Sequence, residues 1–203
     1  MSLTDTQIFD LAKRMKIPLV FCDFKTKLKS KKLQYNKTYI VNLEDEFDAD
    51  GQRNDGSHYT AFQVNKYPNG KIERCYFDPF GAPAPQAVEE FVGGGHIPYN
   101  TKDIQSLMNS ACGWYALGWS YWINCYEDRS RDLYTDCETF TDLFDDLSKG
   151  IDHKHNEFVL KHFFRSSDAS KRKPVEVWAQ GEGRIPADPE TISSEDDDNK
   201  KHL

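Results

Sequence analysis

Long apolar runs are missing from this sequence, and none approaches the roughly 18 residues that a membrane-spanning helix needs. The first residues also lack the apolar stretch of a secretory signal. The five cysteines, at positions 22, 75, 112, 125 and 137, are odd in number and form no closely spaced pair. We therefore expect a protein of a reducing compartment without membrane association.

An excess of basic charge is missing too, because 26 Lys and Arg face 33 Asp and Glu, which gives a formal net charge of −7. DNA binding is therefore expected to be weak or absent. The lysine-rich run between Lys25 and Lys37 is the one candidate surface for a polyanion, although such runs are usually solvated faces.

Metal-ligand and phosphate-loop spacings are absent as well. His153, His155, Cys125 and Cys137 match neither C-x-x-C nor H-x-x-x-H, and the glycines at 93–95 lack the lysine of a phosphate loop. We expect no metal and no cofactor.

What the sequence does have is enough length and aromatic surface for one core. It contains 203 residues, of which 13 are Phe, 10 are Tyr and 4 are Trp. We predict one domain over residues 1–165. The polar, acidic segment 166–203 cannot bury enough surface to offset its ordering entropy, so we predict a largely disordered tail.

Apolar periodicity and turn chemistry predict the main elements of that domain. Helices are expected over residues 4–16, 86–92, 136–149 and 156–164, and strands over 38–43, 58–64, 72–77 and 96–99. Residues 67–70, Tyr-Pro-Asn-Gly, form a strong turn signal between the second and third strands.

This hairpin brings two polar residues to one end. If the turn is centred on Pro68 and Asn69, His58 lies opposite Pro79 and beside Asp78. A shift of one residue would place the imidazole and the carboxylate directly opposite. Taken singly, His58 is an ordinary strand-end residue and Asp78 an ordinary turn residue.

The stretch from Gln105 to Trp119 is polar at first and then apolar on almost every face, which is typical of a helix buried within a domain. Ser110 is a candidate for its N-terminal cap. Cys112 would then lie on the first turn, where the peptide dipoles favour a thiolate. The alternative is a small structural cysteine in the core.

Together these residues form a candidate nucleophilic site. Cys112 would be the nucleophile, His58 its base and Asp78 the group that orients the imidazole. The side-chain amide of Gln105 and the backbone N–H of Cys112 would stabilise the oxyanion.

Three segments resemble the adenain-like cysteine peptidases, named for the adenovirus maturation protease, and the superfamily that includes SUMO-deconjugating proteases. They are residues 56–62 (Gly-Ser-His-Tyr-Thr-Ala-Phe), 77–81 (Phe-Asp-Pro-Phe-Gly) and 105–113, which ends in Asn-Ser-Ala-Cys-Gly. The order His, acid, Gln, Cys and the gap from Gln105 to Cys112 match, and the resemblance spans about residues 4–125. Adenoviral enzymes carry Glu where Asp78 stands, and a Trp commonly follows the histidine where Tyr59 stands.

The resemblance implies an α+β, papain-like or adenain-like peptidase whose central, nucleophile-bearing helix packs on a mixed β-sheet. It assigns His58, Asp78, Cys112 and Gln105 the roles given above. It also implies an endopeptidase of a virophage, a Polinton-like element or another DNA virus that processes capsid or virion precursors. Such an enzyme would be a monomer in the virion and the cytoplasmic virus factory, and an activating peptide is a further partner to expect.

Three other functions remain open. A deconjugase of ubiquitin-like modifiers would use the same chemistry with a wider docking surface. An acyltransferase would use the same triad, and a catalytically inactive interaction module would use none of it.

Overall fold

The computed structural model describes residues 2–107, 109–126 and 132–165, so the predicted tail and most of the predicted turn over 125–132 lie outside the described residues. The helices are α1 (Asp5–Arg14), α2 (Gln86–Phe91), α3 (Cys112–Cys125), α4 (Leu133–Thr141) and α5 (Lys154–Arg165), with 3₁₀ helices η1 (Lys25–Ser30) and η2 (Leu147–Lys149). The strands are β1 (Leu19–Phe24), β2 (Lys37–Asn42), β3 (Tyr59–Lys66) and β4 (Ile72–Phe77).

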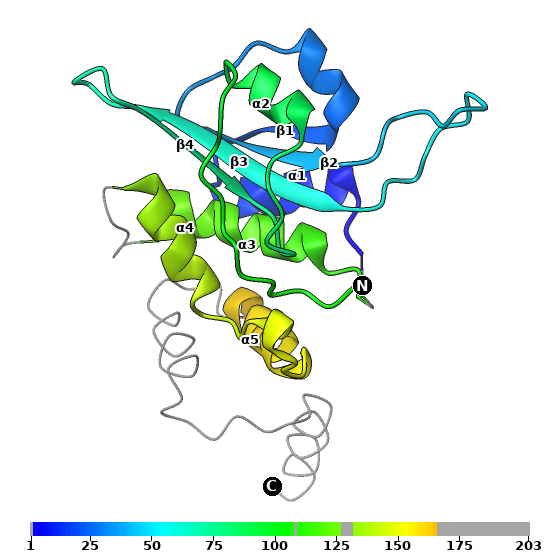
Figure 1. Ribbon diagram of the computed structural model, residues 1–203, viewed down its shortest axis with the longest axis vertical. Helices are drawn as coiled ribbons and strands as arrows, with labels where there is room; N and C mark the ends of the chain where they lie inside the picture. Colours follow the sequence, from blue (N-terminus) through cyan, green and yellow to red (C-terminus); the bar gives the residue numbers. More distant parts are fainter. Residues whose placement is uncertain (1, 108, 127–131, 166–203) are drawn as a thin grey trace, which may run out of the picture.

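The described strands form one mixed sheet in the order β1-β2-β3-β4 (Figure 1). β1 runs parallel to β2, and the other neighbours are antiparallel. Successive side chains of a strand point to opposite faces. Tyr39 and Val41 of β2 therefore join one apolar cluster, while Ile40 between them joins the other.

Helices cover both faces of the sheet, so the sheet is the middle layer (Figure 1). α1, α3 and α4 pack on one face, and α2 with η1 lies over the other. The first face carries the larger core, where Trp119 of α3 stacks on Phe77 of β4 with ring centroids 5.7 Å apart. The predicted α+β class, with a central helix packed on a mixed sheet, is confirmed.

The first helix follows its sequence signals closely. Thr4 and Gln7 form a reciprocal capping box, in which each side chain accepts a hydrogen bond from the other's backbone N–H. Ile8 and Ala12 are buried against α3 and the sheet, as the apolar spacing predicts.

Two predicted elements differ from the structure. The helix predicted over 136–149 is wrong as a single element, because α4 begins at Leu133 and ends at Thr141 and η2 follows as a separate turn. Asp132 caps α4 and Asp146 caps η2, and these two local caps outweigh the continuous apolar spacing. The strand predicted over 96–99 is a single bridge between Tyr76 and Tyr99.

The lysine-rich run forms η1 and an exposed connection to β2. Lys25 pairs with Asp45 at 3.0 Å, and Lys27 pairs with Glu46 at 2.9 Å. Part of the positive charge thus faces the acidic loop after β2 rather than solvent. No helix in the described part of the chain is long and apolar enough to cross a membrane.

Phe140 provides the test of the packing between α4 and the sheet. It is fully buried and contacts the rings of Phe77, Phe144 and Phe163. We expect Phe140→Ala to lower the free energy of unfolding by about 3–5 kcal/mol, measured by chemical denaturation. Phe47→Ala is the control, because Phe47 is 55% exposed and should cost less than about 0.5 kcal/mol. Equal losses for the two variants would contradict this packing.

Candidate active site

His58 and Asp78 lie at the end of the β3–β4 hairpin, just outside the paired residues. His58 Nε2 is 2.8 Å from Asp78 Oδ1. The predicted register is wrong by one residue: the ladder pairs Lys66 with Ile72, which centres the turn on Asn69. If the same pairing is continued beyond the strands, His58 lies opposite Phe80. The rings of these two residues stack with centroids 4.4 Å apart.

Asp78 is almost fully buried and is held from several directions. Its Oδ1 also accepts the backbone N–H of Phe80 at 2.8 Å. The side chain of Asn100 accepts the backbone N–H of Asp78 and donates to its carbonyl. The carboxylate therefore has little freedom to turn away from His58, which is the property that an orienting group needs.

Phe80 covers the histidine, and Tyr59 lines the same cavity as the cysteine. The Phe80 ring lies on the imidazole, so it shields His58 although no tryptophan follows the histidine. The Tyr59 hydroxyl donates to Asp5 at the start of α1. The backbone N–H of Tyr59 helps to lower the pKa of Cys112.

Cys112 is the first residue of α3 and is 5% exposed. The residue at the cap position is Ala111, which offers no side-chain hydrogen bond, so the prediction that Ser110 caps this helix is wrong. Asn109 instead accepts the backbone N–H of Ala111 at 3.2 Å. An α-helix leaves its first N–H groups without intrahelical acceptors, so the N–H of Cys112 stays available to a ligand.

The imidazole and the thiol lie close enough together for each to shift the pKa of the other. Burial alone lowers the pKa of His58, but the hydrogen bonds to Asp78 and Cys112 and their charges outweigh burial and raise it to about 9. Burial alone raises the pKa of Cys112. The contact with His58 and the N–H groups of Tyr59 and Gly113 outweigh it and hold that pKa below its ordinary value. These contacts favour a thiolate beside an imidazolium, against the effect of burial.

Gln105 is also buried, and its orientation is fixed by its neighbours. Its Nε2 donates to the carbonyl of Asn109 at 3.1 Å, and its backbone N–H donates to the carbonyl of Pro79 at 3.1 Å. A primary amide carries two N–H donors, and the bond to Asn109 uses one of them. Asn109 thus connects Gln105 to Ala111, the residue before Cys112.

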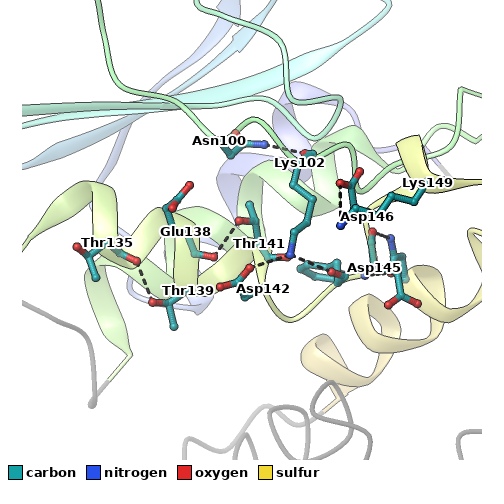
Figure 2. Close-up of polar contacts among 12 residues, drawn as sticks. Asn100, Lys102, Thr135, Glu138, Thr139, Thr141, Asp142, Asp145, Asp146 and Lys149 are labelled. Carbon is teal, nitrogen blue, oxygen red and sulfur yellow. Dashed lines mark hydrogen bonds and ion pairs between the residues drawn. The ribbon is translucent and has the colours of Figure 1, made fainter. Parts of the chain in front are cut away.

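The segment that carries Gln105 is fastened to the C-terminal half of the domain. Lys102 reaches the end of α4, where it pairs with Asp142 at 2.7 Å and donates to the carbonyl of Thr141, as Figure 2 shows. The Lys102 carbonyl accepts from Asn100 (Figure 2). Asn156 of α5 donates to the carbonyl of Ile104 at 3.0 Å. These contacts fix the segment between the Asp78 turn and Gln105.

A cavity of about 330 Å³ opens at Cys112. The start of the chain, including Asp5, lines it together with Asn42, Asp55 and Tyr59. A larger cavity of about 510 Å³ lies at the opposite end of α3, next to Ile123 and Asn124, and contains none of the four candidate residues. Of these two cavities, the one at Cys112 is next to the sulfur.

The structure brings His58 into direct contact with Asp78, places Cys112 near the same imidazole, and ties Gln105 to the turn before the cysteine. Sequence reasoning missed Asn100, Phe80 and Asn109, which hold or cover these residues. The Phe-Gly that follows Asp78-Pro79 in the sequence was a signal for Phe80. Asn109 lies in the Asn-Ser-Ala-Cys-Gly segment but was given no role, and nothing local in the sequence marked Asn100.

No protein-family model and no curated protein matches the sequence. Among solved structures, the chain is similar to HopZ1a, crystallised in complex with IP6, with 11% identity, a TM-score of 0.40, and 59% of this chain and 44% of that chain covered. It is also similar to the ASFV pS273R protease, with 16% identity, a TM-score of 0.37, and 59% and 57% covered. The chain spans about half the length of these proteins, and the assignment of the site rests on its own contacts.

The pH dependence of Cys112 alkylation tests the ion pair. We expect the rate with iodoacetamide to rise with pH through a midpoint below that of an ordinary cysteine. In His58→Ala the midpoint should move upward, because the contact that lowers the pKa is lost while burial remains. Cys112→Ser provides the background from the other cysteines. An unchanged midpoint in His58→Ala would contradict the pairing.

Proposed function

We propose that the chain is a cysteine endopeptidase that uses Cys112 as nucleophile, His58 as base and acid, Asp78 as orienting group and Gln105 as oxyanion donor. One observation supports this most: a histidine at a hairpin end is hydrogen-bonded to a buried carboxylate and lies near the cysteine at the head of the central helix. A buried structural cysteine needs no such partners, and burial alone would raise its pKa.

The mechanism follows from the contacts. The thiolate of Cys112 attacks the scissile carbonyl, and the developing oxyanion accepts from the free N–H of the Gln105 amide and the N–H of Cys112. The imidazolium of His58 then gives its proton to the leaving amine, so that a thioester and a free amine form. Water attacks the thioester with His58 as base, which releases the acid and restores the thiol.

Asp78 keeps the imidazole in place through both steps. With Nε2 engaged by the carboxylate, Nδ1 is the ring nitrogen left to exchange the proton with the sulfur and the leaving group. Since Asp78 is buried and already accepts from Phe80, it can hold His58 without reorganising during the reaction.

For the substrate, we infer capsid or other virion precursor proteins, and for the source, a DNA virus or a virus-like mobile element. This inference rests on the sequence resemblance to adenain-like peptidases. We accordingly expect a monomer that acts in the virion and the virus factory. We expect it to bind DNA weakly or not at all. An activating peptide would belong to the same proposal.

Loss of the sulfur tests the function. We expect Cys112→Ala to abolish cleavage of a co-expressed virion precursor, read as new termini by mass spectrometry, while the melting temperature stays near wild type. Cys125→Ala is the matched control, since Cys125 lies at the other end of α3 and should leave cleavage intact.

Full cleavage by Cys112→Ala would refute the assignment. Covalent labelling of Cys112 by a ubiquitin-like modifier vinyl sulfone would instead favour a deconjugase. Labelling that depends on acetyl-CoA would favour an acyltransferase.

A variant that lacks the proposed oxyanion donor, Gln105, tests its role separately. Gln105→Ala should lower kcat by about 100- to 1,000-fold, or about 2.7–4 kcal/mol, with a smaller change in KM, because the lost hydrogen bond strengthens only as charge develops. Gln86→Ala, on the exposed face of α2, is the control. A change in kcat below about threefold for Gln105→Ala would remove Gln105 from the mechanism.

A further inference from the structure

His58 comes at the end of a loop that has no core of its own. Residues 43–58 connect β2 to β3 and extend beyond the sheet (Figure 1). None of these residues is buried, so the packing of their side chains does not fix the loop. A catalytic histidine needs a defined position, because a displacement of about 1 Å can cost about 100-fold in rate. Hydrogen bonds must therefore hold the end of the loop that carries His58.

Asn42, the last residue of β2, makes hydrogen bonds to both ends of this loop. Its Oδ1 accepts the backbone N–H of Glu44 at 3.0 Å and that of Ser57 at 3.3 Å. The first bond turns the chain out of β2, and the second holds the residue before His58. The backbone adds one further bond, from the N–H of Leu43 to the carbonyl of His58, at 2.9 Å.

The other contacts of the loop involve its first half and its tip. Asp45 and Glu46 pair with lysines of η1, and a bridge between Phe47 and Arg53 closes the tip. Among the contacts of the described residues, the bond from Ser57 to Asn42 is the side-chain bond that fastens the end next to His58.

The surroundings of Asn42 leave its amide little freedom to turn. The side chain belongs to a residue that is 2% exposed, and a buried amide keeps its hydrogen bonds. Gly56 lies against it with a φ of 86°, and a Cβ at this position would lie 3.0 Å from Asn42 Cγ. Glycine tolerates both this φ and this contact. Tyr59 is opposite Asn42 in the strand ladder, and its hydroxyl is held by Asp5.

The point at which the loop is fastened is next to the candidate nucleophile. Asn42, Gly56 and Ser57 line the same cavity as Cys112. A hydrogen bond at this point restricts His58 directly, because only the peptide bond to Ser57 lies between them.

We propose that Asn42 is a positioning residue for the reaction: it holds the loop end at Ser57, so that His58 stays within reach of both Asp78 and Cys112. The inference rests on the proposed peptidase function and adds a residue that acts through His58.

Loss of the Asn42 amide should affect the chemical step more than substrate binding. In Asn42→Ala the N–H groups of Glu44 and Ser57 lose their acceptor, so His58 gains freedom to move. We expect kcat with a peptide substrate to fall by about 10- to 100-fold, while KM changes by less than about threefold. The pH midpoint of Cys112 alkylation by iodoacetamide should rise, because burial raises the pKa of Cys112 and the neighbouring His58 lowers it.

Asn36→Ala is the control for the loss of a similar hydrogen bond. Asn36 acts at the other end of the same two strands, where its Oδ1 accepts the backbone N–H of Lys66 at 3.0 Å. This variant should lower the melting temperature but leave kcat and the alkylation midpoint near their wild-type values.

Gly56→Ala tests the same contact without removing the amide. The added methyl group would displace Asn42, so this variant should lower kcat and raise the alkylation midpoint as Asn42→Ala does. Gly51→Ala is its matched control in the same loop, since Gly51 has a similar φ of 76° and a Cβ there would meet nothing within 4 Å. Gly51→Ala should keep kcat within about threefold of wild type.

Two results would overturn the role of Asn42. One is a folded Asn42→Ala or Gly56→Ala protein that keeps the wild-type kcat and alkylation midpoint. The other is an equal loss in the Asn36 and Gly51 controls. Gly56→Ala carries the test if Asn42→Ala fails to fold. Alkylation needs no substrate, so it still tests Asn42 if wild type cleaves no peptide, a result that would refute the peptidase proposal alone.

Discussion

The contact between His58 and Asp78 is the interaction on which the site depends. It joins the two ends of the β3–β4 hairpin just beyond the last paired residues. It also raises the pKa of His58, so that the imidazole near the Cys112 sulfur carries a positive charge. The same contact explains why Cys112 can be buried and still favour the thiolate, since burial alone would do the opposite. The central helix adds the N–H of Gly113 and its positive end to the same sulfur.

The C-terminal helices support this contact from a distance. Lys102 fastens one end of the Gln105 segment to α4, and Asn156 fastens its other end to α5. Gly81 makes the approach possible: its φ of 70° suits glycine, and a Cβ there would lie 2.8 Å from the carbonyl oxygen of Thr101. α4 and α5 thus belong to the structure of the site, although they carry none of the four candidate residues.

The sequence was informative wherever the determinants are local. The apolar spacing of residues 4–16 and the all-round apolar character of residues 112–123 predict α1 and α3, because helix periodicity and burial are read from neighbours. The hairpin was predicted, but its register was off by one, since Tyr67 and Lys71 also pair across the turn and move its centre to Asn69. Asn100 escaped notice because its role depends on contacts with Asp78, which is far away in the chain and which no spacing rule reports.

The central claim is that Cys112 and His58 form a thiolate–imidazolium pair held by Asp78. Nitrogen-15 NMR of the His58 ring across a pH titration measures the charge of the imidazole directly. The account predicts a protonated ring at pH 7 that loses its proton near pH 9. A neutral ring at pH 7, with a midpoint near the ordinary value of about 6.5 for histidine, would contradict it.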